Sequence, residues 1–100
     1  MTATIEDGYI SFEAHGFECE VIEYAEYTGE SWWQAFVYAH KDVDVSECAP
    51  KHGLQPVSHT AGPDMRRYRL GRTTSVKFTD SVSAILAVTD FAQRAAEKHR

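Results

Sequence analysis

The chain has few cysteines, no long apolar run and no leader-like N-terminus, and each of these absences excludes a class of protein. Its two cysteines, Cys19 and Cys48, are too few for the disulfide framework of a small secreted domain. No apolar stretch reaches the ~20 residues that a membrane-spanning helix requires, and the N-terminus lacks the basic and apolar regions of a signal peptide. We therefore expect a cytoplasmic protein with reduced thiols and no membrane partner.

Basic residues are almost absent from the first half of the chain. The first 49 residues contain eleven acidic residues and one basic residue, Lys41, whereas the remainder contains nine basic and four acidic residues. The two parts carry −10 and +5, which gives the net charge of −5. A negative total disfavours nonspecific binding to nucleic acid, although a local basic cluster can still bind it. The asymmetry indicates an acidic binding face.

The opening segment predicts a β-hairpin. Residues 9–14 alternate in polarity, and His15-Gly16 is suited to a two-residue turn, because both residues tolerate the left-handed region of backbone conformation. Folding the chain there pairs residues whose numbers sum to 31. One face then carries Ala14–Phe17, Phe12–Cys19 and Ile10–Val21, and the other carries Glu13–Glu18, Ser11–Glu20 and Tyr9–Ile22. A slip of one residue would destroy this agreement.

Further strands are predicted over residues 32–40, 67–70 and 75–78. The second hairpin strand should continue to about Tyr27, with a β-bulge or bend at Val21-Ile22, where two apolar residues adjoin and the alternation changes phase. Residues 41–65 contain all three prolines and are expected to form a long irregular connection, which is uncommon in a compact domain of this size.

A C-terminal helix is predicted from Ser81 to about Lys98, with Thr79 or Asp80 as its N-cap. The helical period gathers its apolar residues on one side: Val82, Ala84, Ile85, Val88, Phe91, Ala92, Ala95 and Ala96. The 100 residues should form a single α+β domain, in which a curved antiparallel sheet of four or five strands packs against this one helix.

Acidic residues gather on the polar face of the predicted hairpin. Glu13 and Glu18 face each other directly, and such like-charge pairs are destabilising. The predicted acidic strip contains Glu13, Glu18, Glu20, Glu23, Glu26 and Glu30, and it leads towards Trp32 and Trp33. To a basic partner, spaced carboxylates resemble a row of phosphates. The alternative is that the strip is only solvated, or that arginines of the 67–70 strand neutralise Glu18 and Glu20 internally.

The two tryptophans are adjacent on a strand, so their side chains should point to opposite faces of the sheet. One should lie in the core. The other must be covered by the 41–65 segment, by a second copy in a homodimer or by a target protein, since tryptophan is common at the centre of interfaces.

A basic cluster follows the irregular connection. Arginines can contact phosphates while an aromatic side chain stacks on a base, so a nucleic-acid-binding module is the alternative function. The cluster contains Arg66, Arg67, Arg69 and Arg72, with Tyr68 among them.

Catalytic and metal-binding motifs are not recognisable. Gly-x-Ser-x-Gly, phosphate-binding glycine loops and His-Glu-x-x-His are absent. Cys48, His52 and His59 have an unconvincing spacing for zinc, so a small enzyme or metal protein built on this loop is only a third hypothesis. We expect no enzyme activity, no cofactor and no metal.

The leading hypothesis is therefore a non-enzymatic binding protein. Its acidic strip and tryptophan turn would engage a basic surface on another protein. Small acidic proteins occur among the inhibitors of phages and mobile elements, so a nucleic-acid-handling machine is one candidate target.

Overall fold

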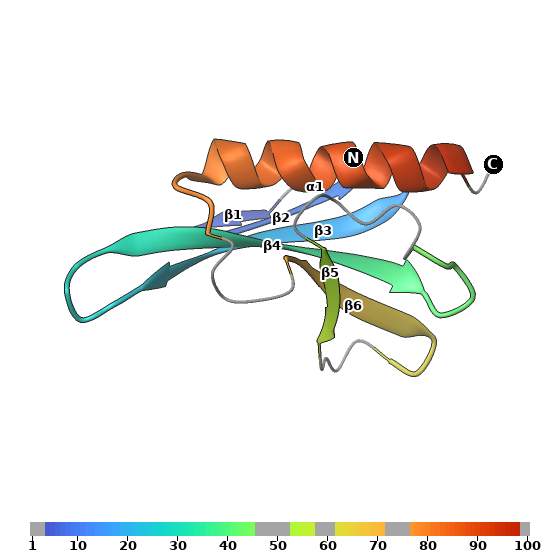
Figure 1. Cartoon of the computed structure of the whole chain (residues 1–100), viewed down its shortest axis with the longest axis horizontal. Coiled ribbons are helices and arrows are strands. Elements are labelled where there is room, and N and C mark those ends of the chain that lie inside the picture. Colours follow the sequence, from blue (N-terminus) through green and yellow to red (C-terminus); the bar gives the residue numbers. More distant parts are fainter. Residues whose placement is uncertain (1–3, 46–52, 58–61, 72–76, 99–100) are drawn as a thin grey trace.

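A computed structural model describes residues 4–45, 53–57, 62–71 and 77–98 of the chain. In these residues, six antiparallel strands form one sheet in the order β1-β2-β3-β4-β6-β5, and one long helix lies across one of its faces (Figure 1). The predicted α+β class is confirmed. The elements are β1 (Thr4–Glu6), β2 (Tyr9–Ala14), β3 (Phe17–Ala25), β4 (Ser31–His40), β5 (Leu54–Val57), β6 (Met65–Leu70) and α1 (Ser81–Lys98).

The predicted hairpin is confirmed in its register. Strands β2 and β3 pair from Tyr9↔Ile22 to Ala14↔Phe17. At the turn, His15 has a φ of 52° and Gly16 a φ of 88°. Both residues therefore adopt the left-handed conformation that a tight two-residue turn demands. Turn chemistry and alternation agree here, which fixes the faces of both strands.

The predicted bulge in β3 was wrong. Strands β3 and β4 pair without interruption from Glu18↔Tyr38 to Ala25↔Ser31, so no residue is inserted at Val21-Ile22. Ile22 is instead partly buried on the face away from the helix, because that face is itself partly apolar at this point. The strand ends at Ala25, two residues before the predicted end. Without a phase change, Glu23 lies on the helix-covered face.

Strand β4 is central. It pairs with β3 along one edge, while its other edge pairs with β6 over Phe36–His40 and forms a single bridge between Trp33 and Phe78. That bridge is the described end of the strand predicted over 75–78, whose residues 75–76 lie outside the described part. Both of its faces are rather apolar because one packs in the core against α1, while on the other the guanidinium of Arg67 lies over the buried Phe36.

Two short edge strands were not predicted. Strand β5 lies within the segment expected to be irregular, and Pro56 in its middle argued against a strand. At the edge of a sheet the missing N–H of proline can face away from the ladder, so β5 still pairs with β6. Strand β1 pairs with β2 at the opposite edge.

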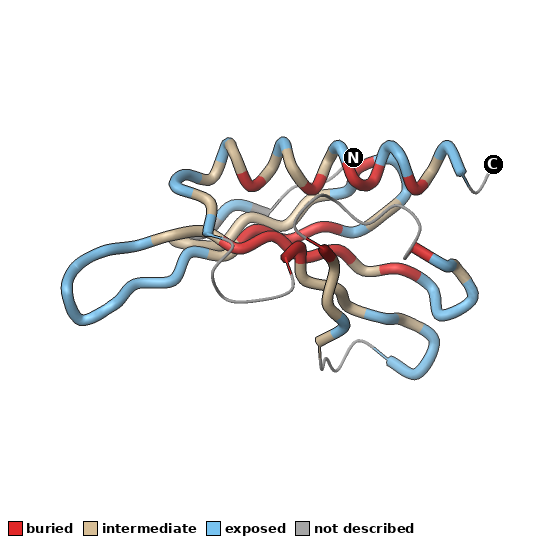
Figure 2. Tube along the Cα trace, in the orientation of Figure 1, coloured by how far each residue is buried: buried red, intermediate tan, exposed pale blue. Residues whose placement is uncertain are grey.

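The core lies between α1 and the central strands (Figure 2). Fully buried alanines let the helix backbone approach β3 and β4 closely, and Val88 and Phe91 belong to the same buried cluster as Val21 and Val37. The buried helix residues are Ala84, Val88, Phe91, Ala92 and Ala95. Among the described residues, no helix is both long and apolar enough to cross a membrane.

The predicted apolar side of the helix was too wide. Val82 was assigned to it but is 61% exposed, and Leu86, one turn further on, is 64% exposed. A helix lying on a sheet buries only the stripe that faces the sheet, and the flank carrying Val82 lies outside this stripe.

Asp80, one of the two predicted candidates, is the N-cap of α1. Its Oδ1 accepts a hydrogen bond of 2.7 Å from the backbone N–H of Ser83. This hydrogen bond lowers the pKa of Asp80, because it favours the ionised carboxylate.

Replacing Phe91 tests the position of the core. Because Phe91 is fully buried, Phe91→Ala should lower the free energy of unfolding in urea by about 3–5 kcal/mol. Leu86→Ala removes an exposed side chain from the same helix and should change it by no more than about 0.5 kcal/mol. Equal losses of unfolding free energy in the two variants would show that α1 does not turn its Phe91 side towards the sheet.

The Asp80 cap predicts a pH-dependent contribution to stability. The pKa of Asp80 is lower in the folded protein than its ordinary value. Its contribution is therefore complete at neutral pH and is lost as the pH falls through the folded-state pKa. In urea titrations at several pH values, the difference in the free energy of unfolding between the wild type and Asp80→Ala should shrink as the pH falls. A constant difference between the two proteins would contradict the capping role.

Candidate functional site

The sheet face away from α1 is the candidate site, and we call it the outer face. Side chains alternate along each strand, so residues next to the buried Cys19 and Val37 point to this face. No helix of the described chain covers it, because α1 lies on the opposite side (Figure 1).

Charged and aromatic side chains form an ordered pattern on the outer face. Strand β3 contributes acids, β4 contributes aromatic residues and β6 contributes arginines. Two successive rows follow from the strand register: Glu18–Tyr38–Arg67 and Glu20–Phe36–Arg69. We call these the acidic, aromatic and arginine columns. Lys77, beside the Phe78 bridge, lies beyond the same edge of β4 as the arginine column.

Glu20 is the centre of a polar network. It is only 8% exposed. The hydroxyl of Tyr9 donates a hydrogen bond to its Oε2, and Nη2 of Arg67 lies 3.2 Å from its Oε1. Oε1 itself makes no well-aligned hydrogen bond, so the contact with Arg67 is an ion pair without hydrogen-bond geometry. The guanidinium also lies 3.9 Å above the ring of Phe36.

The network holds two phenols in their neutral form. The hydrogen bond to Glu20 is the largest of the effects that raise the pKa of Tyr9 to about 12. Burial, followed by the charge of Glu20, raises the pKa of Tyr38. Tyr9 therefore remains a hydrogen-bond donor to the carboxylate at physiological pH.

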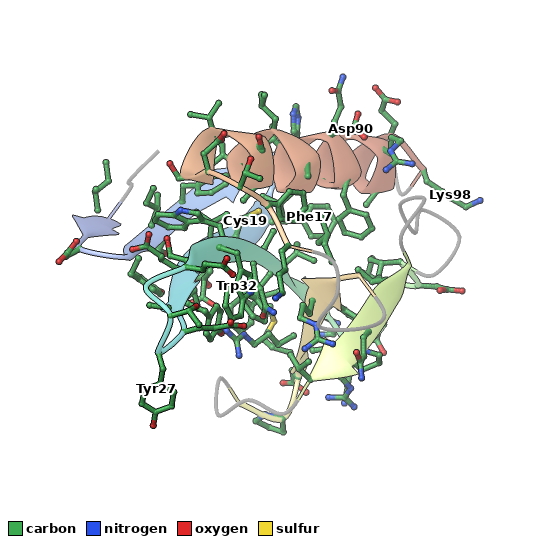
Figure 3. The ribbon with its side chains drawn as sticks, turned by 60° about the vertical axis from the view of Figure 1, so that its left-hand side comes forward. Phe17, Cys19, Tyr27, Trp32, Asp90 and Lys98 are labelled. Carbon is green, nitrogen blue, oxygen red and sulfur yellow. The ribbon has the colours of Figure 1, made fainter. Side chains whose placement is uncertain are left out.

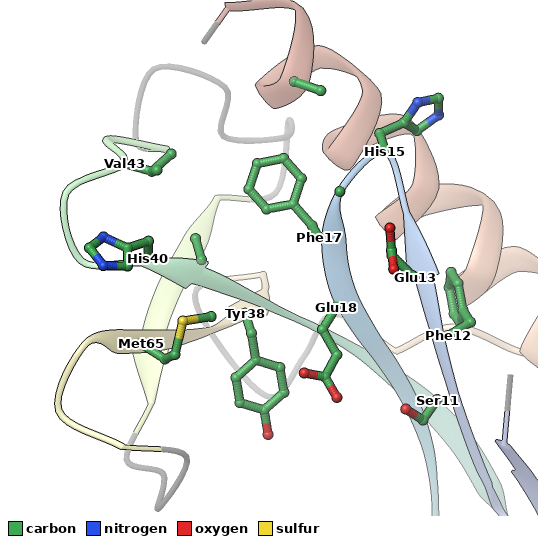
Figure 4. A pocket seen from close by; sticks show the side chains of 13 residues that line it. Ser11, Phe12, Glu13, His15, Phe17, Glu18, Tyr38, His40, Val43 and Met65 are labelled. Carbon is green, nitrogen blue, oxygen red and sulfur yellow. The ribbon is translucent and has the colours of Figure 1, made fainter. Parts of the chain in front are cut away.

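Glu13 and Glu18 differ from Glu20. They face each other directly across the hairpin, both are exposed, and no cation of the described chain forms an ion pair with either. They border a hollow of about 890 Å³ near the His15-Gly16 turn. Figure 4 shows Glu18 and Tyr38 projecting to the same side of the sheet. The hollow is also lined by Ser11, Phe17, His40, Val43 and Met65.

The rest of the predicted acidic strip is dispersed. Glu23 lies on the helix-covered face, opposite Trp33. Glu26 forms an ion pair of 3.6 Å with Lys77, and Glu30 is exposed in the turn between β3 and β4. The structure therefore does not gather the six glutamates on one face, and the two that remain exposed on the outer face are Glu13 and Glu18.

The two tryptophans point to opposite faces, as predicted. Trp33 packs against the core, whereas Trp32 lies on the outer face. Trp32 stacks on Tyr24 with ring centroids 6.0 Å apart, and Nζ of Lys77 lies 4.2 Å from the centre of its ring. Its own neighbours thus partly cover Trp32. Figure 3 shows Tyr27 projecting away from the molecule at the turn between β3 and β4.

The arginine cluster is divided between the two faces. Arg66 points to the helix side and donates to the carbonyl oxygens of Pro63 and Met65, at 3.2 Å each. Arg67 is engaged with Glu20, and Nη2 of Arg69 donates to Oε1 of Gln55. Within the described residues, no carboxylate forms an ion pair with Arg69. Arg72 lies outside the described residues.

The cysteine and histidine hypothesis is not tested, since Cys48, His52 and His59 lie outside the described residues. Cys19 is fully buried, and burial raises the pKa of its thiol to about 12, so it is not a reactive nucleophile. In the described part of the chain, no group of three or more histidine, cysteine or acidic residues is arranged to hold a metal ion.

Sequence reasoning identified Glu20 but missed that Tyr9 and Tyr38 surround it. In the predicted hairpin Tyr9 already shared a face with Glu20, so its contact could have been anticipated. The contribution of Tyr38 depends on the register between β3 and β4, which alternation alone did not fix.

Comparisons of the chain with protein-family models, with curated proteins and with solved structures each found no match.

The ion pair predicts a specific pattern of stability. The side chains of Arg67 and Glu20 are only 19% and 11% exposed. Arg67→Met should lower the free energy of unfolding by roughly 2–3 kcal/mol, because it leaves the Glu20 charge without a counterion. Adding Glu20→Leu to Arg67→Met should recover most of that loss in urea denaturation. Additive losses would show that the two side chains do not act as a pair.

Proposed function

We propose that the chain is a non-enzymatic binding protein that uses the outer face of its sheet to engage a basic site on another protein. The observation that carries this proposal is the exposed pair of Glu13 and Glu18, which the described chain leaves without a cation. We further propose a cytoplasmic location and no catalytic role.

The pair does not serve the stability of the fold. Like charges directly opposite each other in an antiparallel sheet destabilise it by about 0.2–1 kcal/mol. The chain places Arg67 beside Glu20 but places no described cation beside Glu13 or Glu18. A cation from a partner would weaken this repulsion, so relief of the repulsion would add to the free energy of binding.

The surroundings of the pair suit a basic side chain. On the outer face, Tyr38 and Met65 line the adjacent hollow together with the exposed Glu18. Apolar and aromatic walls can pack against the methylene groups of lysine or arginine while the carboxylates bind its charged end. The excess of acid in the first half of the chain would speed the encounter with a basic partner.

Exposed aromatic residues supply a second contact. Tyr27 is fully exposed at the β3–β4 turn, Tyr24 is exposed near the end of β3, and the partly buried Trp32 stacks on Tyr24. Such residues act as anchors in protein interfaces. A partner that spans both regions would contact the acidic pair and the aromatic turn at the same time. A phosphate-binding surface of a nucleic-acid-handling machine, blocked by these carboxylates, is the partner class we favour.

The nucleic-acid-binding alternative has less support from the geometry. Arg66 lies on the other face from Arg67 and Arg69, and Arg67 is already paired with Glu20. The alternative predicts salt-sensitive retention on immobilised single-stranded DNA or RNA at about 50 mM salt. Retention there that weakens in Arg69→Gln would favour it over our proposal.

Neutralising the acidic pair should separate binding from folding. In the double variant Glu13→Gln/Glu18→Gln, the free energy of unfolding should rise by up to about 1 kcal/mol, because the repulsion is removed. Proteins captured from cell extracts by the wild type should be lost by this variant in quantitative mass spectrometry. The double variant would thus be more stable than the wild type and yet would capture less protein.

The matched control is Asp90→Asn/Glu97→Gln, which changes the net charge equally on the exposed side of α1. It should retain the proteins that the wild type captures. Equal capture by all three baits would show that Glu13 and Glu18 are irrelevant, and equal loss in both variants would show that only net charge matters.

A further inference from the structure

The outer face carries unpaired charges of both signs. Glu18, in the acidic column, has no cation in ion-pair contact within the described chain. Arg69, in the arginine column, has only the neutral Gln55 as its side-chain partner there. One uncompensated acid and one uncompensated base therefore lie on opposite sides of the aromatic column.

This distribution argues against a uniformly basic partner across the whole face. Such a partner would neutralise Glu18 but would bring like charge against Arg69 and Lys77. A partner whose charges are arranged in the opposite order would satisfy both sides. A second copy of the chain, turned over to face the first, presents its charges in this opposite order.

The strand register shows why. A two-fold axis that lies in the plane of the face and runs along β4 exchanges the acidic and arginine columns. Glu18 of one copy is then placed over Arg67 of the second copy, and Glu20 over Arg69, because each pair shares a row. Packed sheets that are rotated by about 30° keep the acidic column over the arginine column. The same contacts occur twice, as in any isologous interface.

We propose that the outer faces of two copies of this chain pack against each other in a two-fold dimer, with the acidic column of each over the arginine column of the other. This inference rests on the proposed function, namely that the outer face binds protein, and it names a second copy as a partner that supplies the basic site. Tyr38, Trp32 and the partly buried Ile22 would lie inside the interface, where face-to-face sheets bury such side chains.

The molecule has sufficient surface for such an interface. A stable interface buries about 800 Å² on each partner. The accessible surface of the chain is 6288 Å², and the sheet forms one long side of a molecule whose extents are 43 × 28 × 25 Å. The dimer would therefore need about an eighth of the total surface.

Mass measurement by sedimentation equilibrium over a concentration series is the test. The wild type should approach twice the monomer mass of 11.3 kDa, and its dissociation constant should rise with salt. Glu18→Arg should raise the dissociation constant at least about tenfold, because it places like charges together. The exposed position of Glu18 means that this variant should fold, and circular dichroism checks it.

A mixing experiment identifies the contact. Arg67→Glu alone should also be monomeric, since it brings a glutamate against Glu18 of the second copy. An equimolar mixture of Glu18→Arg with Arg67→Glu should regain the dimer mass, because residue 18 of each copy then meets the opposite charge at position 67 of the other copy. If Arg67→Glu does not fold, Arg67→Gln mixed with Glu18→Arg should regain dimerisation in part, because no like charge then faces the arginine introduced at position 18. Asp90→Arg, on the exposed side of α1, is the control and should dimerise like the wild type.

A wild type that stays monomeric at every attainable concentration would overturn the dimer, and so would a Glu18→Arg variant that dimerises normally. Either result leaves the proposed function standing, since capture of other proteins by the wild type and its loss in Glu13→Gln/Glu18→Gln are measured separately. Conversely, a dimer confirmed by the mixing experiment would stand even if the capture experiment retained no other protein.

Discussion

The register of the β2–β3 hairpin decides which carboxylates of this protein are neutralised and which remain exposed. It places Glu20 one row along from Glu18 on the outer face, within reach of Tyr9 and of Arg67 from β6. The same register sets Glu13 directly against Glu18, where no described cation pairs with them. A shift of one residue would pair Phe12 with Glu18 or Glu20, so that apolar and acidic side chains would share one face of the hairpin. Fold and candidate site therefore depend on the same pairing.

The two faces of the sheet are built on different principles. The helix side is a dry core of small and branched residues closed by Phe91. The outer face contains features that lower stability. These include a like-charge pair, an ion pair with little exposure and shielded donors without a partner in the described chain: Trp32 Nε1, Arg67 Nε and Arg69 Nε. Each unpaired buried donor costs about 1–3 kcal/mol. Such a concentration on one face indicates a constraint other than folding.

Local signals were sufficient to predict the hairpin and the helix. In the hairpin, His15-Gly16 and the alternation of Phe12 and Cys19 point to one register. In the helix, the spacing of Ala84, Val88 and Phe91 and the Asp80 cap agree in the same way. These elements are determined by residues close together in the chain, so their patterns can be read directly.

Long-range pairings could not be predicted in this way. The partner of Glu20 depends on how β6 aligns with β4, across a segment of the chain in which Pro56 conceals an edge strand. The sequence suggested that arginines and glutamates could meet, but not that Arg67 would pair with Glu20 while Arg69 would contact Gln55. The phase of β3 beyond Val21 was misjudged for a related reason. Alternation alone cannot show that the outer face accepts an apolar Ile22.

Glu18 and Glu20 lie two residues apart on one strand face and should have opposite effects on stability. Measuring the free energy of unfolding of Glu18→Gln and Glu20→Gln beside the wild type tests this expectation most directly. We expect the free energy of unfolding to rise in Glu18→Gln, because the charge of Glu18 is exposed and repelled by Glu13, and to fall in Glu20→Gln, because the charge of Glu20 is paired with Arg67. A loss of similar size in both variants would contradict it, because Glu18 would then also be bound within the chain.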